Sequence, residues 1–150
     1  IASPTRGFTF GGSAPSNVNT ITFITIASLG NAQDFGDLLY TGSAFTGASS
    51  ATRGVAFSGT AADATINYIT MASLGNAQNF GELSTANRYS ASSGSSSTRA
   101  VVGGGGYPST NNSIEFIQIP TTGDAVDFGD LTAARSLLMQ GCFSNGHGGL

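Results

Sequence analysis

Apolar residues are concentrated in three runs along the chain, at residues 21–26, 66–71 and 114–119. Each run repeats the order Ile-x-aromatic-Ile-x-apolar, and β-branched and aromatic residues are typical of β-strands. Successive side chains of a strand point to opposite faces of its sheet. Ile21 and Phe23 should therefore share one face, and Ile24 and Ile26 the other. Because both faces are apolar, the pattern predicts strands whose sheets are covered on both sides.

Each run is followed by a turn and then by a short segment that carries a phenylalanine. Residues 29–31 and 74–76 both read Leu-Gly-Asn, in which Gly and Asn tolerate the positive φ of a tight turn. In the third repeat Pro120 stands here instead, and it should end the strand's ladder. The segments at 34–38, 79–83 and 127–131 then read Asp-Phe-Gly-Asp-Leu or a close variant. We expect a last short strand through each of them.

A Thr-Arg pair marks each repeat, at residues 5–6, 52–53 and 98–99, so the markers are 47 and then 46 residues apart. After the first marker, alternation as far as Phe10 predicts a short strand that ends in a tight turn at Gly11 and Gly12. Pro15, Asn17 and Asn19 predict a loop or a hairpin connection. Residues 132–139 could pass for a helix, but we interpret them, like the segments after Leu38 and Leu83, as a loop and a strand.

Self-similarity at a fixed period indicates a repeat architecture, in which each unit buries its apolar surface against a neighbour. We expect one repeat domain over residues 1–150, with repeats at 5–51, 52–97 and 98–145, and with 146–150 beginning the first strand of a fourth. Each repeat provides three or four short antiparallel strands with short connections. This all-β pattern favours a β-propeller blade over a coil of a parallel β-helix.

Composition narrows the class of function. Only 9% of the residues are charged, Lys is absent and the net charge is -3. The five cations are all arginines: Arg6, Arg53, Arg88, Arg99 and Arg135. Nucleic-acid binding relies on clustered Lys and Arg that neutralise phosphates, so this balance argues against it. No apolar run approaches the roughly 18 residues of a membrane span, so we expect neither nucleic acid nor membrane as a partner.

Order is expected despite the 22 glycines, because 39% of the residues are hydrophobic and lie in regular runs. Cys142 is the only cysteine, so no disulfide can form within the chain. The sequence begins at Ile1 rather than Met, which suggests a processed product or a segment of a longer protein.

Several short motifs suggest enzymes, but none has the required context. Residues 34–36 and 127–129 read Asp-Phe-Gly, as in protein kinases, but a kinase also needs a strand Lys, and this chain has none. The glycines at 103–106 lack the Lys-Ser/Thr of a phosphate loop and indicate a turn. Cys142 and His147 lie close together in a Gly-rich tail with no orienting partner. We therefore predict no catalytic residue, no cofactor and no enzymatic activity.

The recurring acidic residues fit a structural role better than a calcium site. Calcium takes several oxygen ligands, and the candidates are Asp34, Asp37, Asp124, Asp127 and Asp130. Residues three apart on a strand point to opposite faces, and the second repeat offers Asn79 and Glu82 instead. We predict no metal site. The marker arginines Arg6, Arg53 and Arg99 are expected to pair with Asp37, Glu82 or Asp130 between strands or blades, and Phe35, Phe80 and Phe128 to pack in the blade cores.

The repeat resembles two known groups of proteins. Residues 98–107, with four glycines and a tyrosine, followed by an aromatic-containing strand, a Phe and then Ala134 and Arg135, resemble a kelch-type blade. Phe35, Phe80 and Phe128 stand where kelch blades usually have Trp, which is a departure. The full pattern, Thr-Arg-Gly-Val, Gly-rich turn, Ile-x-Tyr/Phe-Ile-x-Ile and Asp-Phe-Gly-Asp-Leu-Thr-x-x-Arg, resembles repeats in virion proteins of marine tailed bacteriophages, including cyanophages. This resemblance covers nearly the whole chain.

The resemblance implies a virion component at the particle surface: a fibre, an appendage or a capsid decoration. Propellers typically use about 4 to 8 blades, so three blades should associate, two chains giving six, or be capped by other virion proteins. The alternative is a lectin-like propeller that binds host-surface glycans, with Tyr40, Tyr89 and Tyr107 as contacts. These tyrosines do not occupy equivalent positions in the repeats, which counts against one sugar site per blade.

Overall fold

The computed structural model describes residues 1–57, 59, 63–86, 89–106, 108–136 and 142–144. This part of the chain contains twelve strands and no helix, so it has no helix that could cross a membrane. The strands are β1 (Arg6–Ser13), β2 (Asn17–Thr25), β3 (Gln33–Gly42), β4 (Thr46–Ser49), β5 (Arg53–Phe57), β6 (Thr65–Thr70), β7 (Gln78–Glu82), β8 (Ser92–Ser95), β9 (Arg99–Gly103), β10 (Asn111–Gln118), β11 (Val126–Arg135) and β12 (Cys142–Ser144). The all-β prediction is confirmed.

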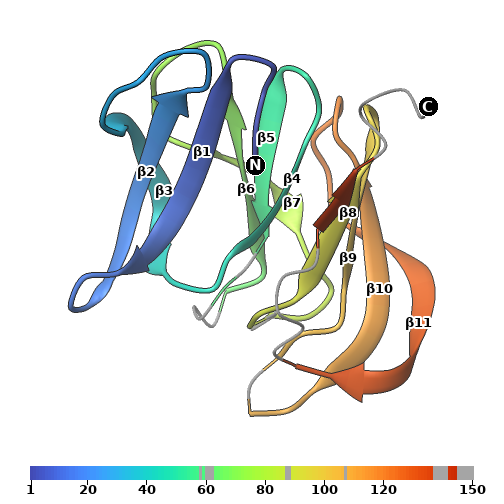
Figure 1. Ribbon diagram of the computed structural model, residues 1–150. Helices are drawn as coiled ribbons and strands as arrows, with labels where there is room; N and C mark the ends of the chain where they lie inside the picture. The colour runs from blue at the N-terminus through green and yellow to red at the C-terminus, as the bar shows by residue number, and fades with distance from the viewer. Residues whose placement is uncertain (58, 60–62, 87–88, 107, 137–141, 145–150) are drawn as a thin grey trace.

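The strands form three antiparallel sheets that follow one another in chain order (Figure 1). Unit 1 is β1-β2-β3, unit 2 is β4-β5-β6-β7 and unit 3 is β8-β9-β10-β11, each paired in sequence order. The short strand β12 runs parallel to β8 and extends the third sheet. The prediction of three or four antiparallel strands per repeat is confirmed for all three units.

The sheets begin earlier than the sequence repeats do. β4 precedes the second Thr-Arg marker and falls in the first sequence repeat, but it pairs with β5 and so belongs to unit 2. β8 joins unit 3 in the same way. In unit 1 the corresponding place is taken by Ala2, which bridges to Gly7. β12 lies beside β8, and residues 146–150, where a fourth first strand was predicted to begin, lie outside the described residues.

The predicted turn at Gly11 and Gly12 is wrong. β1 continues through both glycines to Ser13, and its register with β2 shifts between Phe10 and Gly12. The break in the alternating pattern therefore marks a β-bulge, which adds one residue to one strand without ending it. The hairpin turn follows between Ser13 and Asn17. At the other end, residues 132–135 belong to β11, whereas 137–141 lie outside the described residues.

The hydrophobic core lies between successive sheets and has two parts. One face of unit 1 packs on unit 2 in a cluster of Phe8, Ile21, Phe23, Phe35, Leu38, Phe45, Ala56, Ile69, Met71 and Ala77. The other face of unit 2 packs on unit 3 in a cluster of Ala48, Val55, Phe57, Ile66, Phe80, Leu83, Ala91, Ala100, Val102, Ile117 and Ile119. Unit 2 is therefore covered on both faces, as the apolar pattern predicts. In unit 1, by contrast, Ile24 is 46% and Ile26 is 54% exposed.

Candidate functional site

The outer strand of each unit carries the same β-bulge at its Phe-Gly pair. In unit 1 the neighbours Ile21 and Thr22 pair with Gly36 and Asp34, so the register skips Phe35. The same shift occurs in β7 and β11. The bulge glycines Gly36, Gly81 and Gly129 have φ of 145°, 150° and 137°. The sequence motif therefore builds a bulge, and bulges re-aim side chains and interrupt strand pairing.

The bulge of β3 receives a turn from unit 2, which we call the docking turn (residues 71–77, between β6 and β7). The N–H of Gly75 donates to the carbonyl of Phe35 at 2.9 Å, and that of Ala77 donates to the carbonyl of Asp37 at 2.8 Å. In return, the N–H of Asp37 donates to Asn76 Oδ1 at 3.0 Å. These three bonds tie the outer edge of unit 1 to unit 2, and we call this contact the first junction.

The second junction repeats the same three bonds between unit 2 and unit 3. Its docking turn (residues 119–125) lies between β10 and β11. The N–H of Gly123 donates to the carbonyl of Phe80 at 2.7 Å, and that of Ala125 donates to the carbonyl of Glu82 at 2.8 Å. The N–H of Glu82 donates to Asp124 Oδ1 at 3.0 Å. The turns before β3, β7 and β11 all end in Gly, then Asn or Asp, then Ala. These three residues supply the two N–H donors and the side-chain acceptor of each junction.

Glycine is required at the bulge because the docking turn lies directly against it. A Cβ at Gly36 would lie 2.5 Å from the carbonyl oxygen of Gly75, and one at Gly81 would lie 2.2 Å from that of Gly123. Both contacts are with backbone, which cannot move aside cheaply. At Gly129 in unit 3 no described atom lies within 4 Å of the corresponding position. The equivalent bulge is therefore covered by a docking turn in units 1 and 2 and is left uncovered by the described residues in unit 3.

The marker arginines reach the next unit through backbone carbonyls. Arg6 Nη1 donates to the carbonyl of Met71 at 2.9 Å and to that of Ala72 at 3.2 Å. Arg53 Nη1 donates to the carbonyl of Ile119 at 2.8 Å. Each guanidinium also lies over an aromatic ring of its own sheet, Phe23 at 4.8 Å and Tyr68 at 4.6 Å. A planar cation is suited to this combination of ring stacking and hydrogen bonding.

These partners differ from the carboxylates expected from the sequence. In the described part of the chain, no ion pair joins Arg6, Arg53 or Arg99 to Asp37, Glu82 or Asp130. The acidic residues of the motif meet the next unit through their backbone atoms. Arg99 lies over Phe116 at 4.5 Å. Among the described residues, no carbonyl accepts a hydrogen bond from Arg99 in the way that Met71 and Ile119 do from Arg6 and Arg53.

A buried polar side chain adds a further contact at each junction. Asn67 Oδ1 accepts the N–H of Leu39 at 2.9 Å across the first junction. Glu115 Oε2 accepts the N–H of Ser84 at 3.2 Å across the second, and Ser84 Oγ donates to Oε1 of the same carboxylate. Sequence reasoning missed both residues. The available signal was a polar residue directly after the first Ile of an otherwise apolar strand, with Thr22 at the same place in unit 1.

Serine hydroxyls join the short inner strands of successive units. Ser93 Oγ of β8 donates to the carbonyl of Gly47 in β4 at 2.8 Å, and Ser95 Oγ donates to that of Ser49 at 3.1 Å. Ser49 Oγ in turn donates to the carbonyl of Ala2 at 3.0 Å. The Ser-rich segments before the second and third Thr-Arg markers are therefore part of the contact between units.

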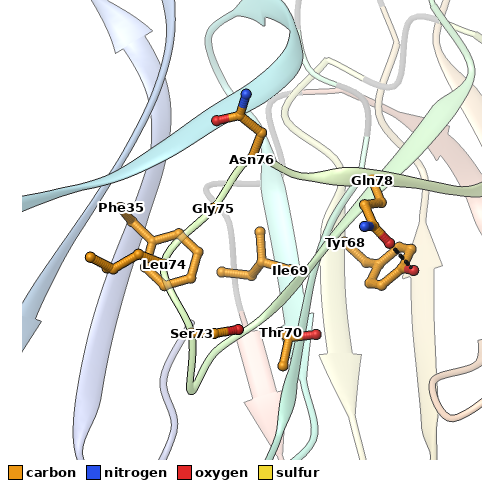
Figure 2. A pocket seen from close by; sticks show the side chains of 9 residues that line it. All are labelled: Phe35, Tyr68, Ile69, Thr70, Ser73, Leu74, Gly75, Asn76 and Gln78. Carbon is orange, nitrogen blue, oxygen red and sulfur yellow. Dashed lines mark hydrogen bonds between the residues drawn. The ribbon is translucent and has the colours of Figure 1, made fainter.

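The residues proposed for glycan contact are spread over the molecule. The hydroxyl of Tyr40 donates to the carbonyl of Thr65 at 2.9 Å. Tyr89 accepts the N–H of Gly106 with its carbonyl at 3.1 Å, and Tyr107 lies outside the described residues. A hollow of about 140 Å³ lies beside the first docking turn, and Figure 2 shows its lining of Phe35, Tyr68, Ile69, Thr70, Ser73, Leu74, Gly75, Asn76 and Gln78. Neither Tyr40 nor Tyr89 lines it.

The phenylalanines predicted for the blade cores fall into two groups. Phe35 and Phe80 are 3% and 2% exposed, one in each junction. Phe128, at the equivalent position in unit 3, is 56% exposed, as is Val126. The molecule therefore has two end faces. The first carries Ile24, Ile26 and the turn at residues 26–32, and the second carries the bulge of β11.

Within the described residues, no three His, Cys, Asp or Glu side chains are grouped so that they could hold a metal ion. Asp34 and Asp127, considered above for calcium, each accept a bond from the glycine of their own bulge, Gly36 at 3.1 Å and Gly129 at 3.2 Å. The recurring polar chemistry of the chain is thus concentrated at the junctions.

Comparison of the sequence with known protein-family models and with curated proteins gave no match.

Proposed function

We propose that the chain is a non-enzymatic structural and interaction protein of a phage virion, as a fibre, an appendage or a capsid-surface component. Its three units are taken as kelch-like β-propeller blades that are completed by association. The observation that carries the proposal is the repeated junction: the same backbone bonds, glycine contact and arginine contact join unit 1 to unit 2 and unit 2 to unit 3.

Two further features support a scaffold. The recurring polar residues of the repeat, among them Asn67, Asn76, Glu115 and Asp124, accept hydrogen bonds from neighbouring units. The end faces leave apolar side chains exposed, and large exposed apolar patches mark interaction sites. The assignment to a virion is supported by the resemblance of the repeat to marine phage proteins.

The test is the content of purified particles. Virions of a phage whose genome encodes the chain are purified from a lysate by density gradient and analysed by peptide mass spectrometry. We expect peptides of this chain to copurify with the particles in stoichiometric amounts, and antibodies against the purified chain to label one place on the particle in electron micrographs. Confinement of the chain to the soluble fraction would overturn the proposal.

The alternative of a glycan-binding module is favoured by one feature, the hollow beside the first docking turn. Its lining includes an aromatic ring and the polar side chains of Thr70, Ser73, Asn76 and Gln78. The hydroxyl of Tyr68 donates to Gln78 Oε1 at 2.5 Å, and Arg53 lies over one face of the ring. A glycan array probed with the labelled chain tests this function. Binding that is lost on Gln78→Ala, at unchanged stability, would establish it beside the structural role.

A further inference from the structure

We infer that the two end faces are the two halves of a third junction, so that one copy of the chain docks head to tail on a second copy. The docking turn at residues 26–32 of one copy would bind the bulge of β11 in the next. This inference deepens the assembly role proposed above and names the partner of the end faces.

The sequence of the end faces supports a second copy as the occupant. The first junction joins residues 34–38, Asp-Phe-Gly-Asp-Leu, to residues 72–78, Ala-Ser-Leu-Gly-Asn-Ala-Gln. Each of these segments occurs once more in the chain without a change, at residues 127–131 and 27–33. The repeated segments lie on opposite end faces, one on unit 3 and one on unit 1. The chain thus carries a second copy of both segments that form the three repeated hydrogen bonds of its first junction.

The hydrogen bonds of the third junction follow from the first two. The N–H groups of Gly30 and Ala32 would donate to the carbonyls of Phe128 and Asp130, as those of Gly75 and Ala77 do at the first junction. The N–H of Asp130 would donate to the side-chain oxygen of Asn31. Backbone groups at a sheet edge are a template for pairing with another chain. Each donor and acceptor pair of the third junction therefore has an equivalent pair at both junctions within the chain.

The apolar surfaces of the two ends also match. Ile69 and Met71 are buried in the first junction with Phe35, and their equivalents Ile24 and Ile26 are about half exposed. A mostly apolar hollow of about 250 Å³ lies on this face of unit 1 and is lined by Ile1, Gly7, Phe8, Thr9, Thr22, Phe23, Ile24 and Ala32. The exposed ring of Phe128 from a second copy would occupy this face, as Phe35 occupies the equivalent face of unit 2.

Arg99 provides an independent indication. Arg6 and Arg53 each bond the first carbonyl of the docking turn in the following unit, from Met71 or Ile119. Arg99 already stacks on Phe116 at 4.5 Å, as the other two stack on their own aromatic rings. The equivalent carbonyl for Arg99 belongs to Ile26 of the next copy. The inference therefore accounts for the one marker arginine whose described contacts lack this bond.

The inner edge imposes one condition on the pairing. β12 pairs with β8. By analogy with the contact between Ala2 and β4, the residues around Ala2 of an incoming copy would also lie beside β8, in the place that β12 occupies. One of these two short segments has to leave that place when two copies associate. The outer contact, which contains the repeated hydrogen bonds, does not involve either segment.

The test uses two variants that each remove one face. Phe128→Asp places a charge on the face of unit 3, and Ile26→Asp places one on the face of unit 1. We expect the unaltered chain to exceed the mass of one 15.0 kDa chain at hundreds of micromolar in sedimentation equilibrium. Each variant alone should remain monomeric, because each keeps only one working face. An equimolar mixture should form a dimer through the two remaining faces.

Each outcome decides the proposal. A variant that still dimerises alone would show that like faces pair, and an unaltered chain that stays monomeric would show that something else covers the ends; both overturn it. Gly129→Ala serves as a further variant, because its Cβ meets no described atom within the chain but would meet the docking turn of a second copy. We expect at least about a tenfold loss of affinity from it. Thermal unfolding in dilute solution controls for folding, and the particle analysis above tests the virion role separately.

Discussion

Two segments of the chain have the same five residues, Asp-Phe-Gly-Asp-Leu, and lie in opposite surroundings. At residues 34–38 the segment lies under the docking turn of unit 2, and Phe35 is 3% exposed. At residues 127–131 it forms the same bulge at the end of the array, and Phe128 is 56% exposed. The following unit covers this position in unit 1, and no described unit covers it in unit 3, as expected of an array whose stability includes neighbour contacts.

Substitution of the bulge phenylalanine should separate the two surroundings most clearly. Phe80→Ala removes a buried ring from the second junction and should lower the free energy of unfolding by about 3–5 kcal/mol. Phe128→Ala removes a half-exposed ring and should cost less than about 1 kcal/mol. Urea denaturation in dilute solution, where copies do not associate, measures both. Equal losses would show that the second junction is not a core.

The bulge glycines give a closer pair, because the backbone is the same and only the neighbour differs. Gly36→Ala should cost about 2–4 kcal/mol, since its Cβ would meet the backbone of Gly75 at a strained φ. Gly129→Ala has a similar φ and no described neighbour, so only the strain of about 1–3 kcal/mol remains. The difference between the two thermal unfolding curves isolates the contact. Its absence would contradict the close approach.

The marker arginines test what holds the units together. Arg53→Ala should lower the free energy of unfolding by about 1–3 kcal/mol, because the carbonyl of Ile119 loses a charged donor and Tyr68 loses its cation. Arg99→Ala loses only the ring contact and should cost about 0.5–1 kcal/mol. Since the acceptor is a neutral carbonyl, the effect of Arg53→Ala should change little with added salt. A strong salt dependence would instead indicate an ion pair with a carboxylate.

The smallest effect is expected at the docking turn. Asn76→Ala removes the acceptor for the N–H of Asp37 and should cost about 0.5–1.5 kcal/mol. Asn31→Ala is the matched control in unit 1, where the same residue lies on the end face, and should have almost no effect in dilute solution. Hydrogen exchange at the amide of Asp37 provides a local readout and should be faster in the first variant only.

The strands could be predicted because their signal is local. The alternation of Ile and aromatic residues at 21–26, 66–71 and 114–119 predicts the three strands correctly. Its prediction of two covered faces is confirmed for unit 2 and is wrong for unit 1, where Ile24 and Ile26 lie on an end face. The turn predicted at Gly11 and Gly12 is wrong because two glycines fit a turn as well as a bulge. Assignment of β4 and β8 to the following unit depends on pairing between strands, which a repeat boundary drawn at the Thr-Arg marker does not report.

The recurrence of the arginines and acids could also be predicted, but not their partners. A sequence displays side chains, so it predicts carboxylates such as Glu82 as the partners of Arg53. The acceptor is the carbonyl of Ile119, and any residue type would supply that group. The exposure of Phe128 has a similar origin, because identical segments in a repeat give identical predictions and only their place in the array differs.

The inner strands of units 2 and 3, β4 and β8, are short and carry small side chains. β4 reads Thr-Gly-Ala-Ser and β8 reads Ser-Ser-Gly-Ser, and their hydroxyls bond directly across to the next inner strand. At the outer edge a phenylalanine and a whole turn separate neighbouring sheets. We expect such units to be wedge-shaped, and stacked wedges follow an arc. The small side chains of the shortest strands would then set the curvature of a longer array, and bulkier residues there would straighten it.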